Sequence, residues 1–557
     1  MRLFRDAVKL LISSKILLIF MFLLFGFVVW ETGSLYGKGT VAATMPLRNA
    51  LTLSIYLFIM MMFLSYEYAR KLFHNGVSEA LLVTMAGRNR KNYKMIFWVM
   101  SIYSSVMSLF VGVIVVKEYL FYKISDPNHE YVVHIIKNIF LNDFLIMELG
   151  IIVGIALAVI QKRMGAYTIM CFLSILISPF ATSMAYLIDL CDVEHSGVGE
   201  MGFKILSYFY IMPGFLTNLM PREEFGESIL PYRFFIIGFW LFLCLSFICF
   251  TRNRYKKYAV VSVVLCLGSF IAYTYPASKM EQTYDIYLNG MPDGIYVWES
   301  KDYITKEEPA DYQISEYDLN LSIRANLSAT ADMKVSKSLE RYRMTLYRQY
   351  KVSKVVDQDG HKLEYTQNQD YIEVRNPNGY HITNIIISYK GSSWDSYANY
   401  QGCYLPGYYA YYPRAGYINL YDELGCIQPY FVDKDTYFKV KVNPGKYISN
   451  LPEKDGIYQG KCDGVTLVSG FYKIKRFENG NQLVYPYLDE FIIHDGKMTE
   501  KECWQETFDF VEEELAKDKI ANCLIFPDEI LMGNVQKAYG EKQIFVYSGG
   551  VYYYSDN

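Results

Sequence analysis

The sequence has no phosphate-binding loop and no surplus of charge of either sign. The motif G-x-x-x-x-G-K-[ST], in which backbone amides hold phosphates, does not occur. The stretch most similar to it, GSLYGKGT at 33–40, has the wrong spacing. The net charge is −3, whereas a protein that binds DNA or RNA usually concentrates basic residues on one face. We therefore expect no ATPase and no cofactor within this chain, and no nucleic acid as a partner.

Histidine is scarce, with 7 among 557 residues. The H-E-x-x-H motif of zinc peptidases sets two imidazoles on one helix face and adds a glutamate as general base. It does not occur, and the histidines beyond residue 276 are His361, His381 and His494, none with a second histidine four residues away. From these absences we predict no metal site, no catalytic residue and no enzymatic activity in this chain.

Apolar residues, in contrast, are abundant and lie mostly in long runs before residue 276. They make up 52% of the chain, and the mean hydropathy is +0.09. Seven runs reach or approach the length that crosses a hydrocarbon core of about 30 Å. They are residues 11–30, 50–66, 95–116, 141–160, 166–189, 232–250 and 258–275. We predict a multi-domain membrane protein whose residues 1–275 form an α-helical transmembrane bundle of about seven spans.

The positions of lysine and arginine predict the orientation of these spans. With the N-terminus inside, the four cytoplasmic segments carry 16 basic residues, and the three longer outer segments carry 7. This asymmetry is the positive-inside signal. The first run is too long for a cleavable signal peptide and lacks a small-residue cleavage site. We expect a multi-pass protein of the cell membrane, in contact with lipid, with an amphipathic helix at 1–14, a cytoplasmic N-terminus and an extracellular C-terminal part.

Residues 67–94 form a polar and basic segment between the second and third spans. Apolar residues recur there at roughly helical spacing, and Gly76 divides the run into two pieces. This pattern predicts a helix-turn-helix on the inner membrane surface. An ordinary cytoplasmic loop with a surface helix would give the same pattern, and composition alone leaves both open.

The segment resembles the coupling-helix region of the permeases of type-2 ABC exporters. The matching residues are Glu67, Gly76, Glu79, Leu81, Leu82, Thr84, Arg88 and Lys94. The resemblance implies that a separate cytoplasmic ABC ATPase subunit, which holds ATP and Mg, docks on this segment. It also implies that the permease works as a homodimer or with a paralogous permease.

Glu148 is the ionisable residue that we single out within the predicted spans. Asn142 and Asp143 are expected at the outer interface, whereas Glu148 lies about 7 Å deeper at 1.5 Å per residue. An ionisable residue within a span is a functional candidate by default. The alternative is a structural glutamate that pairs with a hydroxyl or amide in the bundle.

Period-2 alternation replaces the long apolar runs after a linker at 276–300. ISEYDLNLSI at 314–323 alternates apolar and polar residues, RYRMTLYRQY at 341–350 repeats the pattern, and Asp359–Gly360 is a strong hairpin turn. We predict a mainly β extracellular sandwich over 301–480, followed by a small α/β piece over 481–557.

The predicted sandwich resembles the N-terminal domain of zinc aminopeptidases of the aminopeptidase N class. That family's Ile-x-Tyr-x-Gly segment is matched by Ile387, Tyr389 and Gly391, and Tyr411–Pro413 stands in place of its Trp-Tyr-Pro. FKVKVNP at 438–444 also matches. The resemblance implies that 481–557 is the truncated, non-catalytic start of a peptidase-like domain.

Two further features of this part are candidates for a role. Tyr411, Tyr412 and Arg414 lie in a tyrosine-rich segment that could form an exposed patch for peptide or glycan ends. The alternative is that the rings fill the junction between the sandwich and the following piece. Cys403 and Cys426 could form a disulfide around the same segment.

The function expected from these features is that of a permease subunit of an ABC exporter. It would move a substrate across the cell membrane when the partner ATPase hydrolyses ATP, and the extracellular domain would recognise the substrate or a partner. Two alternatives remain open at this point. One is a membrane-anchored extracellular receptor or sensor, and the other is an inactive peptidase-like binding module.

Overall fold

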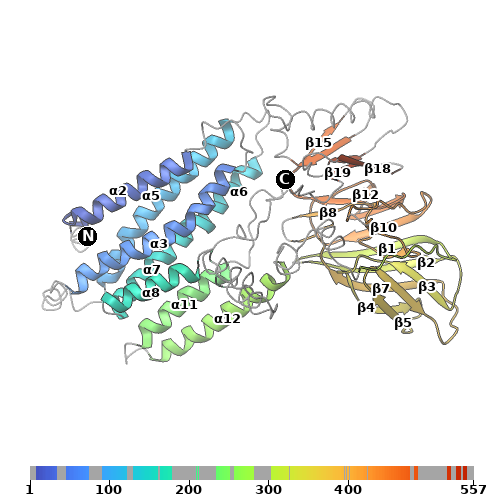
Figure 1. Cartoon of the computed structure of the whole chain (residues 1–557), viewed down its shortest axis with the longest axis horizontal. Coiled ribbons are helices and arrows are strands. Elements are labelled where there is room, and N and C mark those ends of the chain that lie inside the picture. Colours follow the sequence, from blue (N-terminus) through green and yellow to red (C-terminus); the bar gives the residue numbers. More distant parts are fainter. Residues whose placement is uncertain are drawn as a thin grey trace, which may run out of the picture. The chain divides into compact units, whose positions relative to one another are not determined.

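The computed structural model describes most of the helical segments and most of the β region (Figure 1). The described residues are 8–33, 45–74, 91–121, 129–177, 209–211, 234–250, 256–280, 303–476, 482–486, 524–527, 535–540 and 543–548, with gaps at 10, 161–162, 210, 325, 394–395, 397, 400–401 and 423–424.

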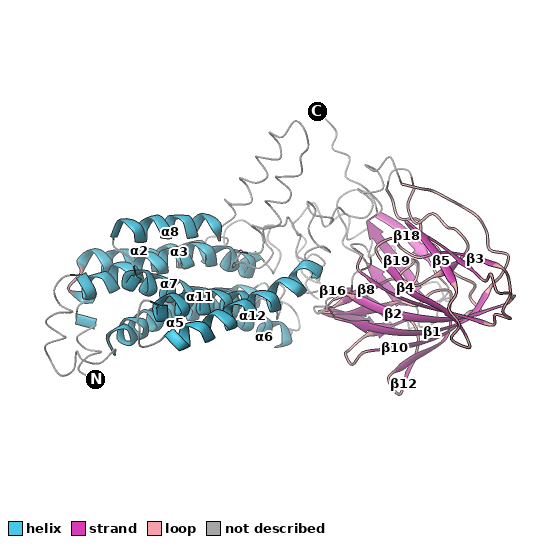
Figure 2. Cartoon of the chain, turned by 90° about the horizontal axis from the view of Figure 1, so that it is seen from below, coloured by secondary structure: helices cyan, strands magenta, loops and turns pink. Residues whose placement is uncertain are grey.

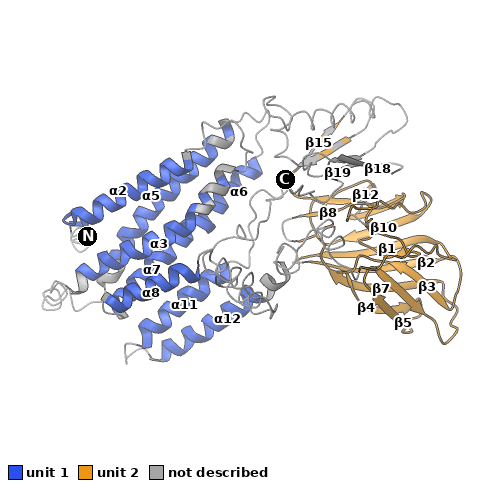
Figure 3. Cartoon of the chain, viewed as in Figure 1, with its two compact units in different colours: residues 1–221, 226–278 blue, residues 222–225, 279–557 orange. Residues whose placement is uncertain are grey.

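The chain divides into two compact units (Figure 3). Unit 1 comprises residues 1–221 and 226–278, and unit 2 comprises residues 222–225 and 279–557. The described part of unit 1 consists of helices with apolar sequences, and that of unit 2 is mainly strands (Figure 2). The predicted change from helical to β structure is therefore confirmed.

The helical unit contains eight α-helices and one short π-helix among its described residues. They are α2 (Lys15–Gly33), α3 (Met45–His74), α5 (Lys91–Phe121), α6 (His129–Ile139), η2 (Phe140–Phe144), α7 (Leu145–Ile160), α8 (Arg163–Leu176), α11 (Phe234–Phe250) and α12 (Lys256–Met280). Before α2, residues 8, 9, 11 and 12 are helical, and a break at Ser13 and Ser14 separates them from α2. This agrees with a separate N-terminal helix.

Four segments are long and apolar enough to cross a membrane, and they correspond to four of the seven predicted spans. They are Lys15–Thr32, Ile96–Lys117, His129–Val159 and Lys257–Thr274. Two shorter apolar helices, Met164–Leu176 and Phe234–Phe250, lie in two other predicted spans, and the run at 50–66 lies within α3. These helices are consistent with membrane association.

The contact between α3 and α7 depends on two glycines one helical turn apart. A Cβ atom on Gly154 would lie 2.1 Å from the Ser65 Oγ and 2.2 Å from the Met62 carbonyl oxygen. One on Gly150 would lie 2.6 Å from the Phe58 carbonyl oxygen. Small residues at this spacing let two helix backbones approach closely, as in the GxxxG pairs of membrane helices. The two helices run in the same direction, because Gly154 contacts later residues of α3 than Gly150 does.

A π-helical turn joins α6 to α7. The Leu145 N–H donates to the carbonyl oxygen of Phe140, five residues earlier, and Leu141, Asn142 and Asp143 are buried. Because α6, η2 and α7 follow one another without a break, Asp143 lies near the middle of the 31-residue segment His129–Val159. Asn142 and Asp143, which we expected at the outer interface, are both buried within the helical unit.

The largest sheet of unit 2 has seven strands, in the order β12-β13-β10-β1-β2-β7-β4. Their bounds are β1 (Ile314–Ile323), β2 (Leu327–Val335), β4 (Lys351–Asp357), β7 (Asn384–Gly391), β10 (Tyr437–Val442), β12 (Glu453–Lys454) and β13 (Ile457–Lys461). The predicted strand at 314–323 is confirmed residue for residue as β1, and its buried positions alternate with exposed ones over most of its length. β1 pairs antiparallel with β2 and parallel with β10.

Two smaller sheets accompany it. The four-stranded sheet has the order β5-β6-β3-β9, and the three-stranded sheet has the order β11-β14-β8. The bounds are β3 (Arg341–Thr345), β5 (Glu364–Asn368), β6 (Tyr371–Arg375), β9 (Arg414–Ala415), β8 (Cys403–Leu405), β11 (Ile448–Ser449) and β14 (Leu467–Ser469). The predicted turn at Asp359–Gly360 is present, with φ +86° at Gly360. It joins β4 of the large sheet to β5 of the four-stranded sheet.

The C-terminal sheet has five strands in the order β15-β16-β17-β19-β18. They are β15 (Tyr472–Arg476), β16 (Gln482–Pro486), β17 (Leu524–Pro527), β18 (Val535–Tyr539) and β19 (Gln543–Ser548). The boundary expected at 480 falls inside this sheet, because β15 pairs with β16. Residues 487–523 of the predicted α/β piece lie outside the described residues.

The core of unit 2 is aromatic and continuous between the sheets. Tyr317 of β1 stacks on Phe438 of β10 with ring centroids 4.9 Å apart, and Tyr412 contacts both rings edge-on. Inward residues of the seven-stranded and four-stranded sheets, such as Leu319 and Ile372, belong to the same buried cluster. This packing confirms a mainly β region, in which residues of both sheets share one core.

The close approach of α3 and α7 predicts that Gly154→Ala destabilises the helical unit. The new methyl group would overlap a backbone carbonyl, and overpacking of this kind costs about 1–3 kcal/mol. Thermal unfolding of the purified protein in detergent measures the effect. Gly26→Ala is the matched control, since nothing lies within 4 Å of its Cβ position. Equal unfolding temperatures for the two variants would contradict the packing argument.

Candidate functional site

The C-terminal end of α3 carries a cluster of charged and polar side chains. Glu67 forms an ion pair with Arg70 one turn later, with 2.9 Å between Arg70 Nη2 and Glu67 Oε2. The other oxygen, Oε1, accepts a hydrogen bond from the Tyr167 hydroxyl of α8. Lys71 donates to the Ser14 hydroxyl, directly before α2. Polar contacts at this end of α3 thus join it to α8 and to the beginning of α2.

This cluster contains one of the eight residues of the predicted coupling segment. Residues 67–74 continue α3 as one helix, and Lys94 lies in the first turn of α5. Gly76, Glu79, Leu81, Leu82, Thr84 and Arg88 lie outside the described residues. The sequence pattern did not single out Arg70 or Tyr167. Arg70 could have been found from its spacing of three residues after Glu67, which places both on one helix face.

Glu148 lies in the first turn of α7 and is 8% exposed. Its Oε1 accepts a hydrogen bond from the Ser104 hydroxyl of α5. One helical turn along α5, the Ser108 hydroxyl donates to Asp143 Oδ2 at 2.8 Å, and Asp143 is fully buried. The pairing of Glu148 with a hydroxyl agrees with the alternative that we weighed. Asp143, which the sequence analysis placed at the interface, forms a second carboxylate–serine pair with the same helix.

A row of hydrogen-bonded side chains precedes Asp143 along α6 and η2. Asn142 donates to the Asn138 side-chain oxygen at 2.9 Å, and the Asn138 amide lies 3.0 Å from His134 Nε2. Asn138 and Asn142 are both buried. The spacing of four residues places the three side chains on one face of the helix.

Arg414 is the largest fully buried side chain of the described residues. Its Nη2 donates to the carbonyl oxygens of Gly407 at 2.7 Å and Tyr409 at 2.6 Å, and its Nη1 donates to those of Tyr408 at 3.3 Å and Tyr430. A buried guanidinium is tolerated when its donors are paired. Arg414 therefore holds two backbone segments together.

Tyr411 and Tyr412 are buried beside Arg414, and none of the three side chains is exposed. The Tyr412 ring lies 4.9 Å from the Arg414 guanidinium, and burial raises the pKa of Tyr412 to about 12. An exposed patch at these three residues is thus a wrong expectation. The rings instead fill the core, and the neighbouring Tyr408 packs edge-on against Phe545 of β19. This agrees with the junction that we weighed as the alternative.

Cys403 and Cys426 are free, and so the disulfide that we considered is not formed. Cys403 is buried, its thiol lies 3.7 Å from the Leu467 carbonyl oxygen, and burial raises its pKa to about 12. The thiolate is the reactive form of cysteine, and so a raised pKa makes this side chain inert at neutral pH. Cys503 and Cys523 lie outside the described residues.

One group of three side chains in the described residues has metal-ligand geometry. Ligand atoms of Asp357, Asp359 and His361 lie within 4.8 Å of one another. The Asp357 carboxylate is already bonded, since Oδ1 accepts from the amides of Asp359 and His361, and Oδ2 lies 2.9 Å from His361 Nδ1. The His361 ring also stacks on Tyr380. These contacts account for the arrangement as a stabilised turn between β4 and β5.

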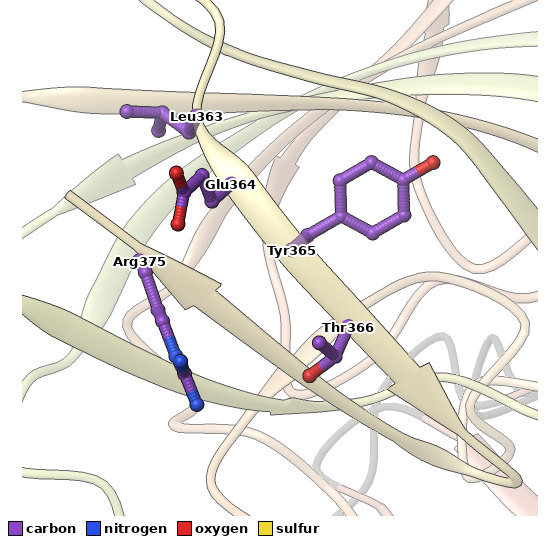
Figure 4. A pocket seen from close by; sticks show the side chains of 5 residues that line it. All are labelled: Leu363, Glu364, Tyr365, Thr366 and Arg375. Atoms are coloured by element: carbon purple, nitrogen blue, oxygen red, sulfur yellow. The ribbon is translucent and has the colours of Figure 1, made fainter. Parts of the chain in front are cut away.

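A shallow hollow of about 360 Å³ lies on the β5–β6 hairpin (Figure 4). Leu363, Glu364, Tyr365 and Thr366 line it from β5 and the residue before it, and Arg375 lines it from β6. Glu364 and Arg375 are directly opposite in the strand register. Opposite charges at such positions stabilise a strand pair. The hollow contains none of the residues that the sequence analysis singled out.

Comparison with known proteins finds solved structures that resemble part of this chain, with low identity and low TM-scores. No family model and no curated protein matches the chain. Solved structures that it resembles include yeast LTA4 hydrolase, with 12% identity, 45% of this chain and 43% of that chain covered, and a TM-score of 0.27. An M1 zinc metallopeptidase from Deinococcus radiodurans has 12% identity, 43% and 60% coverage, and a TM-score of 0.27. The chain thus spans less than two thirds of the length of these structures.

These neighbours correct one expectation of the sequence analysis. The solved structures are those of enzymes, zinc peptidases and LTA4 hydrolase, and this stands against the prediction that the chain is not an enzyme. We withdraw that prediction. At such TM-scores the likeness assigns no activity, substrate or metal to this chain.

The carbonyl contacts of Arg414 predict that Arg414→Met destabilises unit 2 strongly. The substitution removes the guanidinium donor from four carbonyl groups, of which those of Tyr408 and Tyr409 keep a backbone donor, and each buried group left unpaired costs about 1–3 kcal/mol. Proteolysis of the full-length protein during a temperature ramp reports unfolding of the β region. Arg341→Met, at an exposed position of β3, is the control and should behave as the wild type. If Arg414→Met resists proteolysis as well as the wild type does, the guanidinium is dispensable for the stability of unit 2.

Asp357 predicts a dependence of stability on pH. Burial works to raise its pKa, but hydrogen bonds from the His361 ring and from the amides of His361 and Asp359 outweigh this, and the pKa lies below its usual value. The resulting stability is present above the unfolded pKa of about 3.9 and is lost as the pH falls through the folded pKa. Asp357→Asn should therefore lower the unfolding temperature at neutral pH and flatten its decline in acid.

Asp359→Asn, in the same turn, is the control for this measurement. Its side chain is exposed and accepts a hydrogen bond from the Gln358 amide, which an asparagine oxygen can also accept. Equal pH profiles for Asp357→Asn and the wild type would contradict the role of the Asp357 carboxylate.

Proposed function

We propose that this protein is the membrane permease subunit of a type-2 ABC exporter. The observation that carries the proposal is the cluster at the end of α3, where Glu67 of the predicted coupling segment contacts Arg70 and Tyr167. A segment that receives force from a partner must be joined to the helices that it moves. Here polar contacts join the end of α3 to α8 and to Ser14.

The packing of α3 supports a route for this force through the helical unit. The Gly150 and Gly154 contacts bring the backbones of α3 and α7 together. Interfaces of this closeness move as rigid bodies, because packed backbones resist deformation. A push on the coupling segment would then displace α3 and α7 together and change the access of the pathway between the two sides of the membrane.

The proposal requires three partners. A separate cytoplasmic ABC ATPase subunit would hold ATP and Mg and dock on residues 67–94. Lipid and a second permease copy, identical or paralogous, would cover the apolar side chains that the helical unit exposes. Ile16 is 80% exposed, and Phe22 is 78% exposed. Side chains of this kind suit hydrocarbon or another apolar helix.

The β unit would lie outside the cell and recognise what is exported. This placement follows from the positive-inside asymmetry and from the seven spans that the sequence predicts. Its sheets and aromatic core form a folded domain of its own, and its role in recognition is part of the proposal. The substrate class and the direction of movement follow from the resemblance to exporters alone.

Glu67→Gln tests the coupling role. The substitution removes the charge that pairs with Arg70 and keeps the shape of the side chain. We expect membrane insertion to survive and the ATP hydrolysis of the co-purified ATPase subunit to lose about fivefold or more of its stimulation by the permease, since coupling free energies are typically about 1–3 kcal/mol. Reconstituted liposomes containing both subunits allow this measurement.

Glu130→Gln is the matched control, because Glu130 is exposed at the beginning of α6, in a segment predicted to lie on the opposite side of the membrane. It should leave the stimulation unchanged. Failure of any ATP-hydrolysing subunit to co-purify with the wild-type chain, or normal stimulation in Glu67→Gln, would overturn the proposal.

A further inference from the structure

The helical unit buries two carboxyl groups that its described residues do not neutralise. Asp143 is fully buried and Glu148 is 8% exposed. Asp143 accepts a hydroxyl hydrogen bond from Ser108, and Glu148 accepts one from Ser104 and also interacts with the Ser101 hydroxyl. The second oxygen of each, Asp143 Oδ1 and Glu148 Oε2, is buried and has no hydrogen-bond partner among the described residues.

Burial of an ionised carboxylate without a cation is costly. Its transfer from water to a medium of low polarity costs several kcal/mol or more, and such groups take up a proton instead of remaining charged. One or two hydroxyl donors offset only part of this cost, since an ionised carboxylate has about four acceptor sites. The two groups therefore need either a proton or a bound cation.

The charged and titratable groups of the surrounding helices do not supply that cation. In α3, residues 49–66 contain no charged residue, and the titratable ones are Tyr56 and Tyr66. In α5, residues 95–116 contain only Tyr103, whose hydroxyl donates to the Met21 carbonyl oxygen. On α6, Lys137 is exposed and faces away.

The remaining titratable neighbours include no lysine or arginine. On α6 these are Tyr131 and His134, and the latter is joined to the buried region through Asn138 and Asn142. The helix α11 contributes only the thiols of Cys244 and Cys249, and residues 164–176 of α8 contribute Tyr167 and Cys171. No lysine or arginine in these stretches lies against the two carboxyl groups.

We propose that Asp143 and Glu148 form a proton-binding site inside the helical unit. Both groups are protonated in this conformation. Uptake forms one O–H bond on each carboxyl group and converts two hydronium ions to water, one for each group, and release reverses this without any change of oxidation state. The Ser108 and Ser104 hydroxyls position the carboxyl groups on α5, so that movement of α5 relative to α7 would break the hydrogen bonds and change the proton affinity.

The site is independent of the proposed permease function, because it rests on the burial and hydrogen bonding of two side chains. Any movement of the helical unit that changes the surroundings of this site would be coupled to proton uptake or release. A shift of α7 that admits water to Asp143 would favour the ionised form and release the proton. Proton binding and helix movement would then be linked.

Infrared difference spectroscopy of the purified full-length protein tests the site, since a protonated carboxyl group has a C=O band that an ionised one lacks. At a pH of about 7, carboxyl groups in water are ionised. We expect a protonated band to persist at this pH in the wild type and to shift in deuterium oxide. Asp143→Asn and Glu148→Gln should each remove part of the band, and Glu130→Gln, at an exposed position, should remove none.

Two further variants keep the test decisive if Asp143→Asn or Glu148→Gln fails to fold. Ser108→Ala and Ser104→Ala leave both carboxyl groups in place and remove one hydrogen bond each, and so each should shift the band without abolishing it. Absence of a protonated band at neutral pH would overturn the proposal, as would a band that none of these four variants alters. Loss of the band on addition of sodium chloride, with no change in potassium chloride, would identify a sodium site and overturn the assignment to a proton.

Discussion

The closeness of α3 and α7 is the constraint on which the helical unit depends. Lipid offers apolar side chains no gain from mutual contact, and so membrane helices associate through close packing and hydrogen bonds. Gly150 and Gly154 make this packing possible, since a methyl group at either position would overlap the backbone of α3. With these two helices in contact, α5 and α8 are held by polar pairs at defined positions, Ser104 and Ser108 on α5 and Tyr167 on α8.

Both units bury charged or ionisable groups, and they compensate them differently. In unit 2, Arg414 donates to four backbone carbonyl groups of irregular segments, and so a buried cation adds to the hydrogen bonds that these segments make. In unit 1 the backbone groups are already paired within helices. The buried carboxyl groups of Asp143 and Glu148 there accept hydrogen bonds from serine hydroxyls, and one oxygen of each has no partner among the described residues. Helical structure thus leaves buried acids incompletely bonded, which makes their protonation state sensitive to small movements.

The sequence predicted the regular elements well where periodicity was strong. Strand β1 matches the predicted range because its apolar residues alternate and one face is buried. The sequence could not predict the burial of Arg414, since a single arginine among tyrosines suits an exposed patch as well as a core. Its carbonyl partners lie in loops that no pattern brings together. Asp143 was missed because the apolar run begins at 141, whereas the helix begins at His129 and buries Tyr131, Ile135 and Ile139 at four-residue spacing.

The π-helical turn at Phe140–Phe144 has a consequence for how this chain tolerates change in length. One additional residue in a helical turn rotates everything beyond it by about 100°. Deletion of a single residue here would restore regular α-helix, yet it would turn the inward face of α6, with Tyr131 and Asn138, away from the inward face of α7. The irregular turn is what allows one continuous helix to bury two faces that are out of phase. Insertions and deletions within 129–160 are therefore constrained more tightly than substitutions at its exposed positions.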